Sequence, residues 1–184
     1  MYFNGFALQD EAHFFDEIID NGQYVISGFS YGAIKAFKEA LKSTTRVDKL
    51  QLFSPAFFQS KGSKFKRLQL MGYQKNSQAY LEKFTENCFL PYDVKDVTYS
   101  THSAAELEEL LTYEWDVKEL QQLAERGTMI EVYLGGQDKI SDVGPAYAFF
   151  LPFATVTLIK GANHFLQKIT VPTKYPKLQE KEKR

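Results

Sequence analysis

The chain has 184 residues, of which 44% are hydrophobic and 24% charged, and its formal net charge is -1. These values predict one globular domain and exclude a general nucleic-acid binder, which would carry a strongly basic surface. No apolar run approaches a membrane span of about 20 residues, no export signal opens the chain, and a single cysteine fits a reducing compartment, which together predict a cytoplasmic protein.

The N-terminal residues predict the first elements of an α/β fold. Residues 1–3 form a very short predicted strand, and the turn over residues 4–7 follows it. Asp10 is the predicted N-cap of a helix with phenylalanine and isoleucine at helical spacing, ending near residues 21–22. His13 belongs to no motif, and we expect it to be structural or exposed.

A strand, a G-x-S-x-G turn and a helix come next, in that order. The apolar run before Gly28 predicts the strand, and apolar residues at 34, 37 and 41 predict the helix. This context is typical of a nucleophile elbow, in which a serine on a strained turn has small neighbours such as Gly28 and Gly32. The alternative is an ordinary glycine-containing turn. We predict that Ser30 is the nucleophile.

The remaining elements predict an α/β protein with a mostly parallel sheet and helices on both faces. Strands are expected at 47–53, 128–134 and 155–159, with a short helix at 143–151. The last residues, 171–184, are rich in lysine, glutamate and proline and are expected to form a loosely held tail.

The segment 56–127 interrupts the alternation of strands and helices. It predicts helices near 59–74, 76–87 and 103–126, with a capping box at the start of the last, and no strand. We expect one domain over 1–184 in which this insertion forms a helical lid at the carboxyl edge of the sheet. The alternative is a set of packing helices without a gating role.

Ser30 requires a base and a carboxylate that orients the base. His164 follows the last predicted strand, and Asp138 follows the strand before it. The order Ser, Asp, His is the order of an α/β-hydrolase triad. Asp142 is the competing acid, and we prefer Asp138 because it comes directly after the strand and its glycine turn. The structural alternatives are a helix cap for Asp138 and a surface turn for His164.

Two backbone N–H groups are candidates for an oxyanion hole. The N–H of Tyr31 follows the nucleophile at the start of a helix, and the N–H of Phe6 lies in the loop after the first strand. No metal site or cofactor is expected, because this chemistry requires neither.

The chain resembles an α/β-hydrolase that lacks its first strands, and most closely the short pimeloyl-acyl-carrier-protein methyl ester esterases of biotin synthesis, the BioV type. Five segments carry the resemblance over nearly the whole chain: residues 3–6, 28–37, 52–56, 65–69 and 161–164. In related esterases the loop after the first strand reads His-Gly-Trp-Gly, whereas residues 4–7 read Asn-Gly-Phe-Ala. The resemblance implies hydrolysis of the methyl ester to pimeloyl-carrier protein and methanol, without a cofactor.

Charge within the insertion is segregated. Residues 59–83 include six basic residues and one acidic residue, whereas residues 101–126 include seven acidic residues and two basic ones. Acyl carrier proteins are acidic, so we expect a carrier-binding patch, formed by Lys64, Lys66, Arg67 and Lys75. The alternative is a solvated helix face.

Other functions remain open at this point. A thioesterase or lipase-like hydrolase would use the same triad. An inactive scaffold is the rival from another class, although it would not require Ser30, Asp138 and His164 together. We expect a monomer whose partner is an acyl carrier protein, with no nucleic acid and no membrane.

Overall fold

The structure is a computed structural model that describes residues 1–168. The predicted tail at 171–184 lies outside these residues. The strands are β1 Tyr2–Phe3, β2 Leu8–Gln9, β3 Val25–Phe29, β4 Lys49–Phe53, β5 Thr98–Tyr99, β6 Met129–Gly135 and β7 Thr155–Ile159. The helices are η1 Glu11–Phe15, α1 Tyr31–Lys42, α2 Ser63–Lys75, α3 Ser77–Phe89, α4 Ala104–Thr112, α5 Val117–Glu125 and α6 Val143–Phe150.

Five strands form one parallel sheet in the order β1-β3-β4-β6-β7. Its centre is apolar, and Leu52 of β4 lies between Gly28 of β3 and Val132 of β6. Buried parallel strands require such short apolar runs because both faces are covered. The predicted α/β class and its mostly parallel sheet are therefore confirmed.

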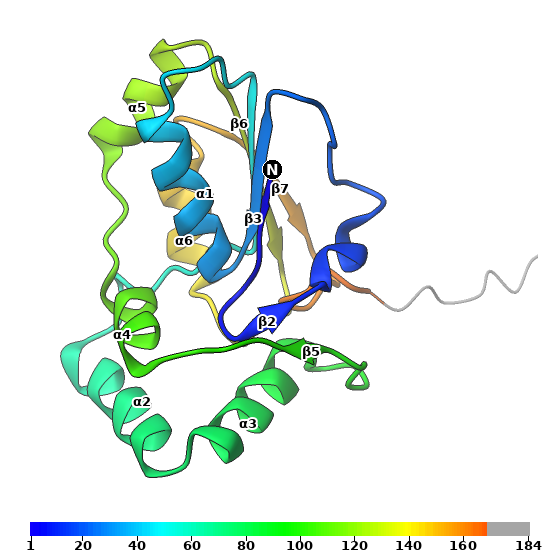
Figure 1. Cartoon of the computed structure of the whole chain (residues 1–184), viewed down its shortest axis with the longest axis vertical. Helices are drawn as coiled ribbons and strands as arrows, with labels where there is room; N and C mark the ends of the chain where they lie inside the picture. The colour runs from blue at the N-terminus through cyan, green and yellow to red at the C-terminus, as the bar shows by residue number, and fades with distance from the viewer. Residues whose placement is uncertain (169–184) are drawn as a thin grey trace, which may run out of the picture.

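The two faces of the sheet carry different covers. Leu50 and Leu52 face the large core, on the side of α1, α5 and α6 (Figure 1). Phe53, one position further along the strand, points to the other side. There the ring of Phe15 from η1 stacks on the Phe53 ring, with the ring centroids 4.7 Å apart. Helices thus lie on both faces, and on the second face η1 is accompanied by the end of α3, which contributes Cys88 and Phe89.

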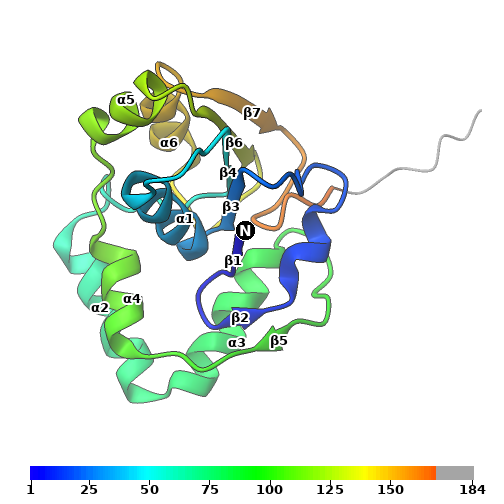
Figure 2. The same cartoon turned by 45° about the horizontal axis from the view of Figure 1, so that its top comes forward.

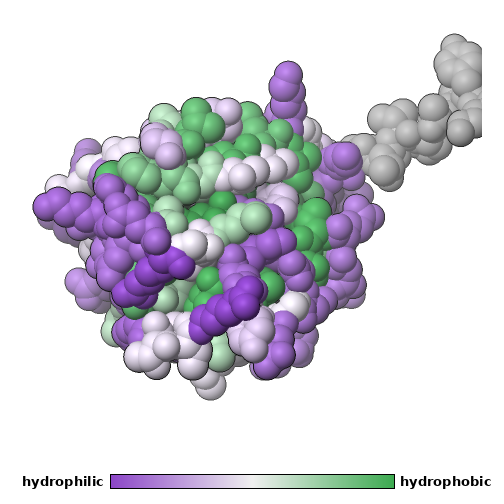
Figure 3. Space-filling model, turned by 90° about the horizontal axis from the view of Figure 1, so that it is seen from above, coloured by the Kyte–Doolittle hydropathy of each residue, from purple (hydrophilic) through white to green (hydrophobic). Residues whose placement is uncertain are grey.

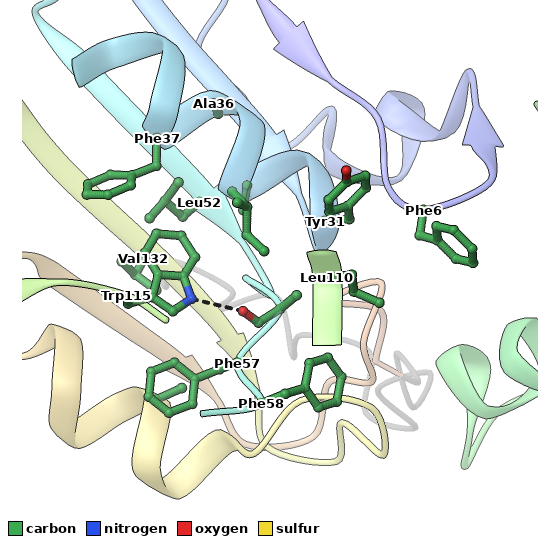
Figure 4. Packing of buried hydrophobic residues seen from close by; sticks show 14 of the residues in the cluster. Phe6, Tyr31, Ala36, Phe37, Leu52, Phe57, Phe58, Leu110, Trp115 and Val132 are labelled. Carbon is green, nitrogen blue, oxygen red and sulfur yellow. Dashed lines mark hydrogen bonds between the residues drawn. The ribbon is translucent and has the colours of Figure 1, made fainter. Parts of the chain in front are cut away.

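The insertion divides into two parts. Helices α2, α3 and α4 lie at the end of the molecule where the strands end (Figures 1 and 2). The remaining helix, α5, packs beside α1 and β6 in the layer on the sheet. The indole N–H of Trp115, just before α5, donates to the carbonyl of Ala56 at 2.9 Å (Figure 4). The bond joins the first residue of the insertion to the segment before α5, and both residues are buried in the large core.

The prediction that 56–127 holds no strand was wrong. The two residues of β5 pair antiparallel with β2, Leu8 opposite Tyr99. A pairing of two residues between distant segments leaves no periodicity in the sequence. The predicted helix over 103–126 is also two helices, because the chain is extended at Tyr113 and Asp116 begins α5 by accepting the N–H of Lys118 at 2.7 Å.

The first predicted helix is shorter than expected, and its predicted cap does not form. Asp10 has φ 63° in the left-handed region and makes no side-chain cap, so η1 contains only Glu11–Phe15. The chain then turns, with the N–H of Ile18 bonded to the carbonyl of Phe15 at 2.8 Å. Phe14 and Phe15 still pack on this side of the sheet from η1, and Ile18 and Ile19 do so from the segment after it.

The end of the molecule seen from above, opposite α2 and α3, carries hydrophilic and apolar residues side by side (Figure 3). Isolated exposed apolar residues are ordinary for a globular surface. Among the described helices, none has the length and apolar character that crossing a membrane requires.

Candidate active site

Ser30 lies at the junction of β3 and α1, as the G-x-S-x-G pattern predicts. Its backbone has φ 54° and ψ -112°, an unfavourable conformation for a residue with a side chain. Two bonds hold the turn: the Ser30 N–H donates to the carbonyl of Phe53 at 2.9 Å, and the N–H of Ala56 donates to the Ser30 carbonyl at 3.2 Å. The strain is therefore maintained by the neighbouring strand.

Both glycines of the turn are required by close backbone contacts. A Cβ at Gly32 would lie 2.0 Å from the carbonyl oxygen of Phe3, and one at Gly28 would lie 2.2 Å from that of Gly32. These contacts bring the start of α1 against β1. The elbow is thus pressed against the strand that leads into the loop with Phe6.

We expect Gly32→Ala to destabilise the fold by about 3 kcal/mol or more, because a backbone oxygen cannot move aside as a side chain can. Gly144→Ala, in the second position of α6 with nothing within 4 Å of its Cβ, is the matched control. It should be neutral or slightly stabilising. Urea unfolding of both variants measures the difference, and equal stabilities would contradict the elbow geometry.

The structure brings His164 to Ser30. Its Nε2 lies 3.0 Å from Ser30 Oγ, although the two residues are 134 positions apart, and its side chain is fully buried. The loop after β7 is held by its own bonds, with the His164 N–H on the carbonyl of Cys88 at 3.2 Å and the Asn163 amide on that of Phe89 at 2.9 Å. Helix α3 of the insertion therefore helps to place the histidine.

Asp138 holds the other side of the imidazole. Its Oδ2 lies 2.6 Å from His164 Nδ1, and its Oδ1 accepts the backbone N–H groups of Ile140 at 2.7 Å and Ser141 at 3.2 Å. These contacts fix the carboxylate and, with it, the plane of the imidazole ring. The arrangement is the one that a nucleophile, base and acid require.

Asp142, the competing acid, is directed elsewhere. It accepts a hydrogen bond from the Ser60 hydroxyl at 2.6 Å and pairs with Lys61 at 3.0 Å. The hydroxyl bond and the lysine together hold the pKa of this carboxyl below its usual value. Asp142 thus links the loop before α6 to the start of the insertion, whereas Asp138 is hydrogen-bonded to His164.

The two predicted oxyanion donors come from adjoining segments. The side chains of Phe6 and Tyr31 contact edge to face with ring centroids 6.4 Å apart (Figure 4). Within residues 1–168, neither backbone N–H donates to another protein group. Both N–H groups therefore remain able to bind a ligand oxygen.

Structural comparison places this architecture among solved proteins. MenH from S. aureus matches with a TM-score of 0.57 at 11% identity, over 89% of this chain and 85% of that chain. BioG from Haemophilus influenzae matches with 0.52 at 13% identity, over 90% and 87%. A putative hydrolase from Bacillus subtilis matches with 0.52 at 16% identity, over 77% of this chain and 54% of its own length.

The chain has the α/β-hydrolase fold. At these identities the similarity concerns the fold alone, and the chain spans only slightly more than half of the Bacillus protein. No protein-family model matches the sequence, and no curated protein matches it closely. In the α/β-hydrolase fold the nucleophile, acid and histidine follow in that chain order, and Ser30, Asp138 and His164 come in this order after β3, β6 and β7.

A cavity of about 210 Å³ lies beside these residues, between the insertion and the loop after β6. Ser30 and His164 do not line it, but Ile140 does, and the N–H of Ile140 is bonded to Asp138. Its apolar walls also include Phe58, Phe65, Phe84 and Leu110. Two exposed lysines, Lys83 and Lys139, are also part of the lining.

The predicted carrier-binding residues lie on α2. Lys64, Arg67 and Lys75 are exposed and Lys66 is half-buried. Among residues 1–168, none of the four pairs with a carboxylate. Phe65, which lies between Lys64 and Lys66 in the chain, lines the cavity, so these basic residues lie next to the cavity wall.

The acidic residues of α4 instead face α1. Glu106 pairs with Lys35 at 3.4 Å, and Glu109 pairs with Lys38 and accepts the Tyr31 hydroxyl at 2.5 Å. Lys38 and the hydroxyl hold the pKa of Glu109 below its usual value. Glu106 and Glu109 of the acidic stretch therefore bind α1, whereas Lys64, Arg67 and Lys75 of the basic stretch stay exposed.

Sequence reasoning missed two residues that hold the site. Asn163, directly before the histidine, is fully buried, and its side chain bridges Phe89 and the N–H of Gln167. Glu11 is buried and bonded to Gly5 of the loop that carries Phe6. The position next to His164 was a signal for Asn163, whereas nothing local marked Glu11. Within residues 1–168, no three His, Cys, Asp or Glu side chains gather as metal ligands would.

Proposed function

We propose that the protein is a serine carboxylesterase. The observation that carries this proposal is the hydrogen-bonded chain from Asp138 through His164 to Ser30, with distances of 2.6 and 3.0 Å, at the carboxyl ends of a parallel sheet. A strained serine with both partners in hydrogen-bond reach has the geometry of covalent catalysis. The α/β-hydrolase fold is compatible with this activity.

In the proposed mechanism, His164 Nε2 takes the proton of Ser30 as Oγ attacks the ester carbonyl. Asp138 keeps the imidazole in place and stabilises its protonated form. The N–H groups of Phe6 and Tyr31 bind the oxygen that becomes negative. Collapse releases the alcohol with the proton from His164, and a water molecule, activated by the same histidine, then frees the acid from Ser30.

The cavity supplies a place for the acyl chain. Its volume of about 210 Å³ exceeds the roughly 150 Å³ of an apolar cavity that admits benzene. Such a space accepts a short, flexible aliphatic chain between Phe58, Phe84 and Leu110. Lys139, which is exposed at the cavity and pairs with no carboxylate among the described residues, is suited to bind an anionic group on the part of the substrate that extends to the surface.

We propose a carrier-linked methyl ester, pimeloyl-acyl-carrier-protein methyl ester, as the substrate. The support is twofold: the sequence resembles esterases of this type, and the basic residues of α2 are exposed without carboxylate partners among the described residues. An acidic carrier protein that docks on α2 would bring its acyl chain to the cavity wall at Phe65.

We also propose that α2, α3 and α4 act as a lid. Ser30 is only 2% exposed and His164 is fully buried, so a substrate reaches Ser30 Oγ only if a neighbouring segment moves. Leu110 of α4 lies between Tyr31 and Phe58 in the close view (Figure 4). The contacts of Glu109 with Tyr31 and Lys38 are the bonds that such a movement would break.

Incubation with three substrates tests the activity. The carrier-linked methyl ester should be hydrolysed with release of methanol, faster than the same ester without the carrier. Preferential cleavage of a carrier thioester would replace the esterase proposal with a thioesterase. A serine-reactive fluorophosphonate probe should label Ser30, and no labelling of the folded protein would contradict covalent catalysis.

Replacing Lys64, Lys66 and Arg67 by alanine should lower kcat/KM for the carrier-linked ester by about 10-fold or more. Each exposed contact contributes roughly 0.5–1 kcal/mol, and the loss should shrink as salt rises. A small nitrophenyl ester should be hydrolysed as before, because it does not need the carrier patch.

A matched control removes three exposed charges from α1, α5 and the loop between α1 and β4, at Lys42, Lys118 and Arg46. It should leave both rates unchanged. Equal losses on both substrates in the α2 variant would mean that these residues hold the insertion together. No loss on either substrate would mean that the basic residues of α2 belong to a solvated helix face and bind no carrier.

A further inference from the structure

A buried carboxylate outside the Ser30-His164-Asp138 chain holds the loop after β1. Glu11, the first residue of η1, is 1% exposed, and its Oε1 accepts the N–H of Gly5 at 2.7 Å and the hydroxyl of Tyr2 at 3.1 Å. Its Oε2 is buried and has no hydrogen-bond partner among the described residues. Burial raises the pKa of this carboxyl. A buried, half-paired carboxylate destabilises a fold, so its presence needs a reason.

The bonds of Gly5 determine the direction of the Phe6 N–H. The carbonyl of Gly5 accepts the N–H of Leu8 at 3.2 Å, and this carbonyl belongs to the same peptide unit as the Phe6 N–H. In a trans peptide the two groups point in opposite directions, so the Phe6 N–H points away from Leu8. Glu11 fixes the preceding peptide unit through the Gly5 N–H. Both units that flank Gly5 are therefore held.

The loop is also pressed against the strand of the nucleophile. A Cβ at Gly5 would lie 2.8 Å from the ring of Phe29, and Phe29 directly precedes Ser30. The Phe29 ring packs in turn on His164 with centroids 4.9 Å apart. A rotation of the Gly5 peptides would therefore shift the Phe6 N–H relative to Ser30 Oγ.

We propose that Glu11 is a positioning residue for ester hydrolysis, whose carboxylate holds Gly5 so that the Phe6 N–H faces the oxygen that becomes negative in the transition state. The inference rests on the proposed function. Because the charge develops only during the reaction, loss of Glu11 lowers kcat and leaves KM nearly unchanged.

Glu11→Met tests the role of the acceptor, since methionine fills a similar volume without an oxygen. With a small nitrophenyl ester, kcat should fall about 10- to 100-fold, a part of the 10²–10³-fold loss for a missing oxyanion donor, and KM should stay within about twofold. Glu11→Gln, whose amide oxygen can accept the Gly5 N–H, should restore kcat to within about threefold of wild type.

Gln51→Met is the matched control. Gln51 is equally buried, at 1% exposed, and accepts the N–H of Asp20 at 2.7 Å, in a segment that carries no group of the site. The Gln51→Met variant should have a lower melting temperature than wild type but the same kcat when folded. A Glu11→Met variant that behaves like this control, with a lower melting temperature and wild-type kcat, overturns the inference.

Two further results keep the test decisive. If Glu11→Met does not fold, Glu11→Asp replaces it, because the shorter side chain withdraws the acceptor from Gly5. Wild-type kcat in folded Glu11→Asp then overturns the inference. A wild-type protein with no hydrolysis and no labelling of Ser30 refutes the proposed function, and the inference with it. An active wild type with an unaffected Glu11→Met refutes the role of Glu11 alone.

Discussion

Ser30→Ala is expected to lower ester hydrolysis by at least about 10⁴-fold, because the hydroxyl is the attacking group that forms the acyl-enzyme. The fold should survive. Among the described residues Ser30 Oγ is hydrogen-bonded only to His164, and the strained backbone at φ 54° is held by bonds of its own peptide groups. Release of methanol from the carrier-linked ester measures the loss.

A matched change at Ser27, in the middle of β3, provides the control. Its hydroxyl bonds weakly to the carbonyl of Met1 at 3.4 Å and lies outside the chain Asp138-His164-Ser30. Ser27→Ala should keep the wild-type rate. Activity of Ser30→Ala near the wild-type level would end the assignment of the nucleophile, and the G-x-S-x-G turn would then be an ordinary strand-to-helix junction.

His164→Ala should be about as damaging as Ser30→Ala, since the serine then has no base. Asp138→Asn should lower kcat by roughly 10³- to 10⁴-fold, because the amide cannot hold the imidazole in the required tautomer. Asp142→Asn should change kcat little, because its carboxylate bonds to Ser60 and Lys61. Single-turnover rates with a nitrophenyl ester measure all three variants.

The comparison between the two aspartates is the sharpest part of this test. Both follow β6, four positions apart, and both changes replace one oxygen by nitrogen. Far greater harm from Asp142→Asn than from Asp138→Asn would show that the wrong acid has been chosen. Equal and small effects would remove the carboxylate from the mechanism and leave a serine–histidine pair.

The sequence predicted the core strands and the pattern around Ser30 because these features are local. The strand before Gly28 is a short apolar run, and the close contacts at Gly28 and Gly32 admit no side chain, so the residues themselves reveal the turn. Asp138 and His164 were found because each directly follows a strand. The structure brings all three together, while their catalytic roles stay predictions.

The features that were missed depend on distant partners. Glu11 looks like an ordinary first-turn helix residue, and its role is visible only when Gly5 lies against it. The two-residue strand β5 exists only because β2 lies beside it. Asp10 likewise has a left-handed backbone conformation, and the expected helix is shorter than predicted. The spacing of the phenylalanines does not reveal this. Local pattern thus predicted the framework, and tertiary contacts decided the details.

The pairing of β2 with β5 has a consequence for how the protein folds. Leu8 pairs with Tyr99, and the N–H of Ser100 donates to the carbonyl of Ala7 at 3.0 Å. The loop after β1 is therefore held by residues that are synthesised much later. His164 arrives later still. Contacts of such sequence separation form slowly, since a long chain segment must close first. We therefore expect the nascent chain to acquire a reactive serine only after β7 and His164 have been synthesised.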